Sequence, residues 1–171
     1  MGKFKTRKNS LRLQGYDYRT PGYYFVTISS YQSQHLFGEI HDKKMNLNQL
    51  GEIVKYHWLL TPGKSPIVEL DEFIIMPNHL HAIIRILNTN QIPVNEDPTL
   101  KFAKAHSLSV LMRTFKASVT KTTRKTLSQP SLQIWHRSFN DHILRDDESL
   151  DAVRFYIRSN PTRWENEKNV Y

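Results

Sequence analysis

The stretch FIIMPNHLHAIIRIL, from Phe73 to Leu87, constrains the fold more than any other part of the chain. Two apolar runs of strand length flank the dipeptide Pro77-Asn78, which is typical of a tight turn. Side chains alternate along a strand, so His79 and His81 project to one face while Leu80 points to the other, where it can enter a core. The stretch therefore predicts two neighbouring strands that carry a pair of imidazoles on one face.

Apolar periodicity predicts the other elements. The first half of the chain contains a strand at 23–32, a hairpin over 36–48, a helix at 48–60 and the two strands above. The second half contains a helix from Ser107 to Lys125, with Ser107 as its N-cap, and a short strand within 131–144. The last helix is capped by Asp146 or Asp147, and Pro161 ends it near Asn160. This order predicts an α+β fold, with a ferredoxin-like antiparallel sheet and helices packed on one face. We expect a single domain over residues 1–171, with a basic N-terminal extension at 1–15.

Basic residues are segregated along the chain. The formal net charge is +8, and no acid stands between Pro98 and Asn140. Such segregation favours a polyanionic partner, most simply nucleic acid, although a solvated basic face would show the same pattern. The candidate contacts to a nucleic-acid backbone are Arg12, Lys101, Lys104, Arg113, Lys116, Lys121, Arg124 and Lys125.

Some classes of protein are excluded or disfavoured by composition. The chain has no cysteine, which excludes disulfides, thiolate metal sites and a cysteine nucleophile. No apolar run approaches the roughly 20 residues that a membrane-spanning helix needs, and the basic N-terminus lacks the apolar core of a signal peptide. We therefore expect a cytoplasmic protein with no membrane partner.

The histidine pair is a candidate metal site. Two neutral imidazoles on one strand face can share a divalent ion and leave positions for a third protein ligand and a substrate oxygen. In the last helix, Tyr156 and Asn160 are four residues apart and share a flank beside the apolar stripe. From spacing alone, His79 and His81 could equally be satisfied by hydrogen bonds on a polar face, and Tyr156 could be a tyrosine at the edge of the core.

Three motifs together resemble a known family. LDEFIIMPNHLHAII, IWHRSFNDHILRDDESL and RFYIRSNP occur in the order found in the HUH single-tyrosine transposases, and within them in the REP-associated tyrosine transposases. The likeness extends from about Leu11 to Trp164. One departure is His136, which follows Trp135 where the family commonly has glutamine.

The resemblance implies roles for four residues. His79, His81 and Asn160 would be metal ligands, and Tyr156 the nucleophile that forms a 5′-phosphotyrosine bond. It also implies Mg²⁺ or Mn²⁺ as cofactor and single-stranded or hairpin DNA as partner. Aromatic residues such as Tyr16, Tyr18 and Trp135 would be available for base stacking, although Trp135 could as well belong to the core.

Other functions remain open at this stage. A DNA-binding protein of the same fold that no longer cuts is the main alternative, and the presence of all four site residues argues against it. A sheet-based RNA-binding module would need aromatic residues where the strand has HLHAIIRI. A hydrolytic metalloenzyme would not depend on Tyr156. The oligomeric state, monomer or homodimer, does not follow from the sequence.

Overall fold

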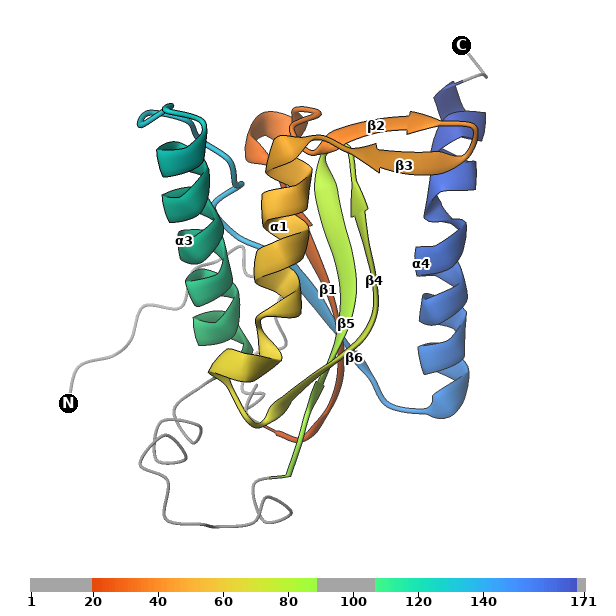
Figure 1. The fold of residues 1–171 in the computed structure, drawn as a ribbon. Coiled ribbons are helices and arrows are strands. Elements are labelled where there is room, and N and C mark those ends of the chain that lie inside the picture. Colours follow the sequence, from red (N-terminus) through yellow and green to blue (C-terminus); the bar gives the residue numbers. More distant parts are fainter. Residues whose placement is uncertain (1–19, 89–106, 169–171) are drawn as a thin grey trace, which may run out of the picture.

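The computed structural model describes residues 20–88 and 107–168, in which helices cover both faces of a four-stranded antiparallel sheet (Figure 1). The sheet has the strand order β4-β5-β1-β6, formed by β1 (Gly22–Ser29), β4 (Val68–Met76), β5 (His79–Ile86) and β6 (Asn140–Leu144). A separate hairpin joins β2 (Gly38–His41) to β3 (Lys44–Leu47). The helices are α1 (Gln49–Leu59), α3 (Leu108–Thr126) and α4 (Asp147–Lys168), and 3-10 turns occur at Tyr31–Ser33 and Pro62–Lys64.

The connectivity confirms the predicted α+β class. The elements β1-α1-β4-β5-α3-β6 form the ferredoxin-like core, with β5 and β1 at its centre. Both partners of β1 run antiparallel to it, and Ser29 pairs with His79 at one end while Tyr23 pairs with Leu144 at the other. The β2-β3 hairpin is inserted before α1, and α4 follows the last strand.

Two separate apolar clusters fill the two sides of the sheet. The larger lies under α1 and α3 and includes Val26, Leu80 and Trp58, all fully buried. The smaller joins Ile83 and Leu144 of the sheet to the α4 residues Leu150 and Ile157. The prediction that the helices pack on one face was therefore wrong for α4, which covers the opposite face (Figure 1). The cause is that the sheet carries apolar side chains on both faces, such as Leu80 on one and Ile83 and Leu144 on the other, and each face needs a cover.

Helix α1 begins within one residue of the predicted start at 48, because Asn48 is its N-cap. Its side-chain oxygen accepts a hydrogen bond of 2.9 Å from the backbone N–H of Gly51. A Cβ atom at Gly51 would lie only 2.1 Å from the carbonyl oxygen of Phe37. The helix therefore lies closer to the segment before β2 than any larger residue at position 51 would allow.

Helix α4 begins as predicted but does not end as predicted. The Asp146 carboxylate accepts a hydrogen bond of 2.7 Å from the N–H of Ser149 and so caps the first turn. Pro161 lies inside the helix, which continues to Lys168. Proline removes one backbone hydrogen bond but its φ suits a helix, and contacts of Trp164 beyond it hold the last turns. Although α4 has 22 residues, neither it nor another helix in the described residues is apolar enough to span a membrane.

Candidate active site

Strand β5 presents His79 and His81 on the face that α4 covers, as the alternation of side chains predicted. Their ring centroids are 4.3 Å apart. Leu80 between them is fully buried in the cluster under α1 and α3. The two imidazoles are thus held side by side by a strand whose opposite face is fixed in the larger core.

Each imidazole has a hydrogen-bond partner on its Nδ1 atom. His79 Nδ1 lies 2.6 Å from Asn78 Oδ1, and His81 Nδ1 lies 2.9 Å from the Thr27 hydroxyl on the paired strand β1. Because the Asn78 oxygen only accepts, His79 carries its proton on Nδ1 and has a lone pair on Nε2. That Nε2 atom is buried and makes no hydrogen bond to the described residues. Hydrogen bonds of this kind orient histidines that bind metals through the other nitrogen.

Burial keeps both rings neutral. It lowers the pKa of His79 to about 4 and, together with the charge of His79, that of His81 to about 3. Removing charged groups from water disfavours the protonated form, and two adjacent cations would repel each other. Neutral imidazole is the form that binds a metal ion, so near neutral pH neither ring has to lose a proton first.

Helix α4 brings Tyr156 onto this face. The phenolic oxygen lies 3.3 Å from His81 Nε2, and the two ring centroids are 5.3 Å apart. Phe25 of β1 contacts both rings, at 5.2 Å from His81 and 6.1 Å from Tyr156. The predicted nucleophile and one predicted ligand are therefore in contact within a single chain.

Asn160 occupies the turn after Tyr156 and is 7% exposed. Its amide nitrogen donates to the Tyr156 carbonyl at 3.5 Å, and within the described residues its side-chain oxygen accepts no hydrogen bond. One turn further on, Trp164 contacts the ring of His79 at 5.9 Å and that of His35 at 5.5 Å. Tyr156, Asn160 and Trp164 follow one another at four-residue spacing, which places them along one flank of the helix.

The donor set suits a divalent ion. The Nε2 atoms of His79 and His81 lie on β5, and the amide of Asn160 lies on α4, which packs against that strand. His81 Nε2 is near the Tyr156 hydroxyl, whereas His79 Nε2 has no hydrogen-bond partner among the described residues. Within residues 20–88 and 107–168, no group of three or more His, Cys, Asp or Glu side chains is placed to bind a metal. The predicted ligand set contains two residues of these types, His79 and His81, and its third member is the amide of Asn160.

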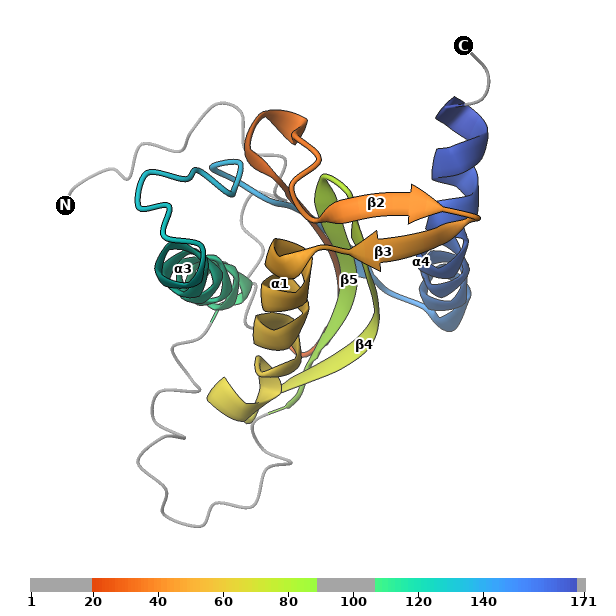
Figure 2. The same ribbon diagram turned by 45° about the horizontal axis from the view of Figure 1, so that its top comes forward.

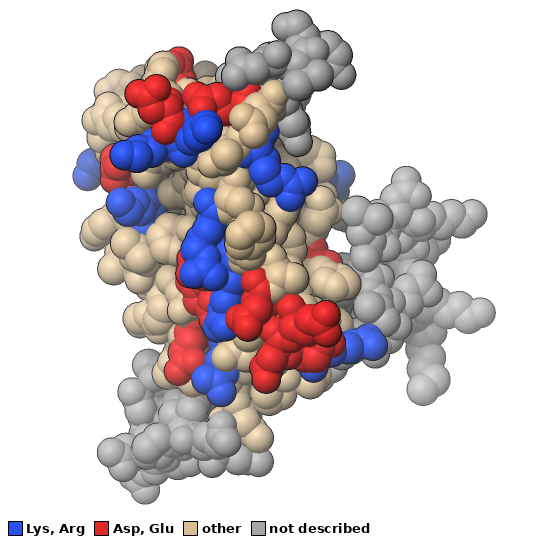
Figure 3. All heavy atoms as spheres, turned by 90° about the vertical axis from the view of Figure 1, so that its right-hand side faces the viewer, with Lys and Arg blue, Asp and Glu red and all other residues tan. Residues whose placement is uncertain are grey.

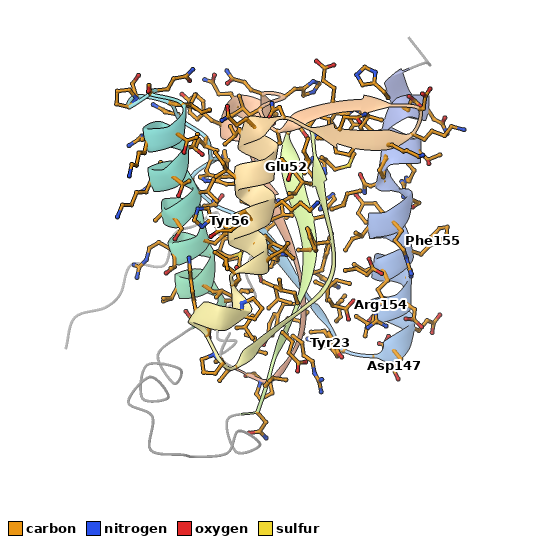
Figure 4. All side chains as sticks on the ribbon, viewed as in Figure 1. Tyr23, Glu52, Tyr56, Asp147, Arg154 and Phe155 are labelled. Atoms are coloured by element: carbon orange, nitrogen blue, oxygen red, sulfur yellow. The ribbon has the colours of Figure 1, made fainter. Side chains whose placement is uncertain are left out.

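Ion pairs fasten α4 to the edge strand β4. Arg154 donates two hydrogen bonds to Asp71, one of them 2.9 Å long, and Arg158 lies 3.4 Å from Glu72. A β-bulge between Leu70 and Phe73 turns both consecutive acids toward α4, whereas a regular strand would alternate them. Figure 4 shows Arg154 directed from α4 toward the sheet, while the neighbouring Phe155 points away from it.

The β2-β3 hairpin holds the far end of the same helix. Its turn reaches across to α4 (Figure 2), where the backbone N–H of Lys43 donates to the Glu165 carboxylate at 3.1 Å. On the surface formed by α4, acidic side chains gather where the helix begins and basic ones lie along its middle (Figure 3).

The predicted nucleic-acid contacts on α3 fall into two groups. Arg113, Lys121 and Lys125 are exposed, and no described residue forms an ion pair with them. Lys116 donates to the carbonyls of His136 and Ser138, and Arg124 donates to that of Leu132. These two residues hold the loop before β6 in place, and burial lowers the pKa of Lys116 to about 8. The predicted residues Arg12, Lys101 and Lys104 lie outside the described residues.

An open basic hollow lies between α3 and the loop before β6. Its walls contain no acid and are formed by Lys116, Ala117, Thr120, Lys121, Arg124, Trp135, His136 and Arg137. Trp135 packs against Phe37 and Phe115, with centroids 5.3 and 5.7 Å away, so it belongs largely to the core. The backbone N–H of His136, which lines the hollow, donates to the carbonyl of Ser29 at the end of β1. Ser29 pairs with His79 of β5, so the hollow lies near the end of the sheet that carries the histidine pair.

Sequence reasoning missed several residues of the site. Thr27 and Asn78 orient the imidazoles, and Arg163 places its guanidinium carbon 5.2 Å from the ring centroid of Tyr156. Thr27 could have been found only from the register of β1 against β5. Arg163 is seven residues after Tyr156, a spacing that returns to the same flank of a helix, and this signal was present in the sequence.

The chain is similar to a bacterial protein in sequence and to a solved transposase structure in fold. An uncharacterized protein of Haemophilus influenzae is 37% identical over 167 residues, covering 94% of this chain and 92% of its own length. The structure of a REP-associated tyrosine transposase bound to a REP hairpin is 17% identical with a TM-score of 0.60, and the match covers 89% of this chain and 73% of that chain. No family profile matches the chain. The chain therefore has the fold of a REP-associated tyrosine transposase, as the sequence motifs indicated.

Proposed function

The chain belongs to the same family as the Haemophilus influenzae protein, and we propose that it nicks and rejoins single-stranded DNA near hairpins through a 5′-phosphotyrosine intermediate. The observation that carries this proposal is the contact of 3.3 Å between the Tyr156 hydroxyl and His81 Nε2. A phenol in contact with one of two adjacent neutral imidazoles, with the amide of Asn160 one turn further along the same helix, supplies the nucleophile and the ligand types that metal-assisted attack on a phosphodiester requires.

The proposed reaction is a transesterification. The Tyr156 oxygen attacks phosphorus in line, the new O–P bond forms, and the bond from phosphorus to the 3′-oxygen breaks. The phenol loses its proton, and the departing 3′-oxygen gains one to become a hydroxyl. Because one phosphodiester replaces another, attack by a second 3′-hydroxyl can reverse the step and join strands without an external energy source.

The chain's own residues orient this chemistry. His79, His81 and Asn160 would hold Mg²⁺ or Mn²⁺. Such an ion, when bound, supplies charge neutralisation at the non-bridging oxygens of the phosphate. The hydrogen bond between the Thr27 hydroxyl and His81 Nδ1 fixes the ring plane of His81, and Phe25 packs against both His81 and Tyr156. Holding reactants in place in this way supplies much of the rate enhancement of two-substrate reactions.

The expected substrate is single-stranded DNA that carries a hairpin. The solved relative is bound to a REP hairpin, and the basic surface of α3 suits the backbone of a flanking strand. We propose Arg113, Lys121 and Lys125 as backbone contacts, since their charges are free of carboxylate partners within the described residues. Lys116 and Arg124 would contribute charge while holding the loop.

A labelled-DNA experiment tests the proposal. The protein is incubated with end-labelled hairpin DNA taken from beside its own gene, with Mn²⁺ or Mg²⁺, and analysed on a denaturing gel. We expect a covalent protein–DNA adduct that disappears in Tyr156→Phe and with a chelator, but persists in Tyr56→Phe, whose exposed ring lies on α1.

The alternatives give different gels. Binding without an adduct, across several DNA sequences, would favour the DNA-binding protein that does not cut. Cleavage that survives Tyr156→Phe would indicate a water nucleophile and a hydrolytic enzyme.

A further inference from the structure

Three arginines lie on the middle of α4, and one of them differs from the others. Arg154 pairs with Asp71 and Asp151, and Arg158 lies 3.4 Å from Glu72. Arg163 is exposed and has no carboxylate partner among the described residues. Its guanidinium carbon lies 5.2 Å from the ring centroid of Tyr156.

The helix geometry explains why Arg163 reaches the tyrosine. Seven residues return to the same flank after almost two turns, and long helical side chains lean toward the N-terminus. The side chain therefore extends back past Asn160 toward Tyr156. A guanidinium over an aromatic face is attracted by the negative charge of the ring face, and this contact favours the position of the exposed Arg163 side chain beside Tyr156.

We propose that Arg163 binds the phosphate that Tyr156 attacks, by donating N–H groups to its non-bridging oxygens. This inference rests on the proposed function. A phosphorus atom in position for attack lies roughly 3–3.5 Å from the phenolic oxygen. A side chain whose charged carbon is 5.2 Å from the ring of that phenol can reach the same phosphate. The planar fork of arginine matches two phosphate oxygens, which a lysine cannot do.

The same contact would continue after the attack. In the phosphotyrosine the phosphate is bonded to the Tyr156 oxygen, and its non-bridging oxygens remain beside the guanidinium. Arg163 would thus stabilise the substrate phosphate, the charge that develops during attack and the covalent intermediate. A role limited to packing on the ring of Tyr156 would not depend on the charge of the phosphate.

The test compares variants of the full chain in a single-turnover assay of adduct formation with Mn²⁺ and labelled hairpin DNA. We expect Arg163→Ala to slow adduct formation on the order of 10²-fold, as when a single oxyanion donor is removed. Arg163→Lys should recover only part of the rate. The matched control is Arg145→Ala, which removes one exposed charge just before α4 and should change the rate by less than about threefold.

A second DNA substrate separates phosphate binding from packing. With a methylphosphonate at the scissile position, which lacks one charged oxygen, the ratio of wild-type to Arg163→Ala rates should fall toward one. A ratio that stays near its value for natural DNA would overturn the inference and leave a packing role. Equal rates for Arg163→Ala and Arg145→Ala would also overturn it. If the wild-type protein forms no adduct with any metal, the proposed function fails and the inference fails with it.

Discussion

Replacing Asp71 with asparagine tests how the tyrosine helix is held over the sheet. Two parallel hydrogen bonds join its carboxylate to Arg154, and the side chains are 17% and 30% exposed. Hydrogen bonds to charged groups contribute about 1.5–3 kcal/mol, whereas exposed ion pairs contribute about 0.2–1 kcal/mol. Because this pair is bidentate and only partly exposed, we expect Asp71→Asn to lower the free energy of unfolding by about 1–2 kcal/mol.

The same pair gives a pH dependence. The hydrogen bond from Arg154 is the main cause that lowers the pKa of Asp71 in the folded protein. A carboxyl group with a lowered folded pKa stabilises the fold above its unfolded pKa of about 3.9, and this stabilisation is lost as the pH falls through the folded pKa. The difference in stability between wild type and Asp71→Asn should therefore persist from neutral pH to about pH 4 and shrink below it.

Urea unfolding followed by tryptophan fluorescence measures both effects. Glu69→Gln is the matched control, because it makes the same chemical change on the same strand. Its partner Arg85 lies 3.1 Å away, and 46% and 51% of the Arg85 and Glu69 side chains are exposed. We expect this control to lose less than about 0.5 kcal/mol. Equal losses in the two variants, or a difference that is unchanged below pH 4, would refute the anchoring role of Asp71.

Three further changes probe other parts of the molecule. Thr27→Val removes the hydroxyl beside His81 Nδ1 and should weaken Mn²⁺ binding about 10–100-fold, as measured by calorimetry, with little change in melting temperature. Lys121→Gln should reduce the slope of log affinity for single-stranded DNA against log salt by about 0.7, and an unchanged slope would exclude a phosphate contact there. Gly51→Ala should destabilise the fold although alanine favours helices by about 1 kcal/mol, because its Cβ would meet the Phe37 carbonyl; a raised melting temperature would contradict this.

The sequence predicted most of the elements because their apolar periodicities are strong. The apolar spacing predicted α1 as a helix over 48–60, and the break at Pro77-Asn78 predicted the turn between β4 and β5. Alternation along β5 also gave the common face of His79 and His81. These are local signals, in which each residue's environment follows from its near neighbours in the chain.

Features that depend on distant contacts were missed. Pro161 does not end α4, since tertiary contacts of the following turns outweigh the lost hydrogen bond. The bulge in β4 that turns Asp71 and Glu72 to one side leaves no periodic signature. Likewise Lys116 looked like a free cation in the sequence, but it holds the carbonyls of a loop 20 residues away. None of these follows from spacing, because each is decided by a partner that the fold brings in.

The residue between the two histidines links the stability of the fold to the geometry of the site. Leu80 is fully buried under α1 and α3, so a shift of β5 by one residue would turn it toward α4 and bury both imidazoles in the larger core. Because strand side chains alternate, such a slip would invert every residue of the strand and is strongly disfavoured. The register that buries Leu80 is the one that pairs His81 with Thr27 and sets it beneath Tyr156. Formation of the core thus fixes the positions of both imidazoles before any ion or DNA is bound.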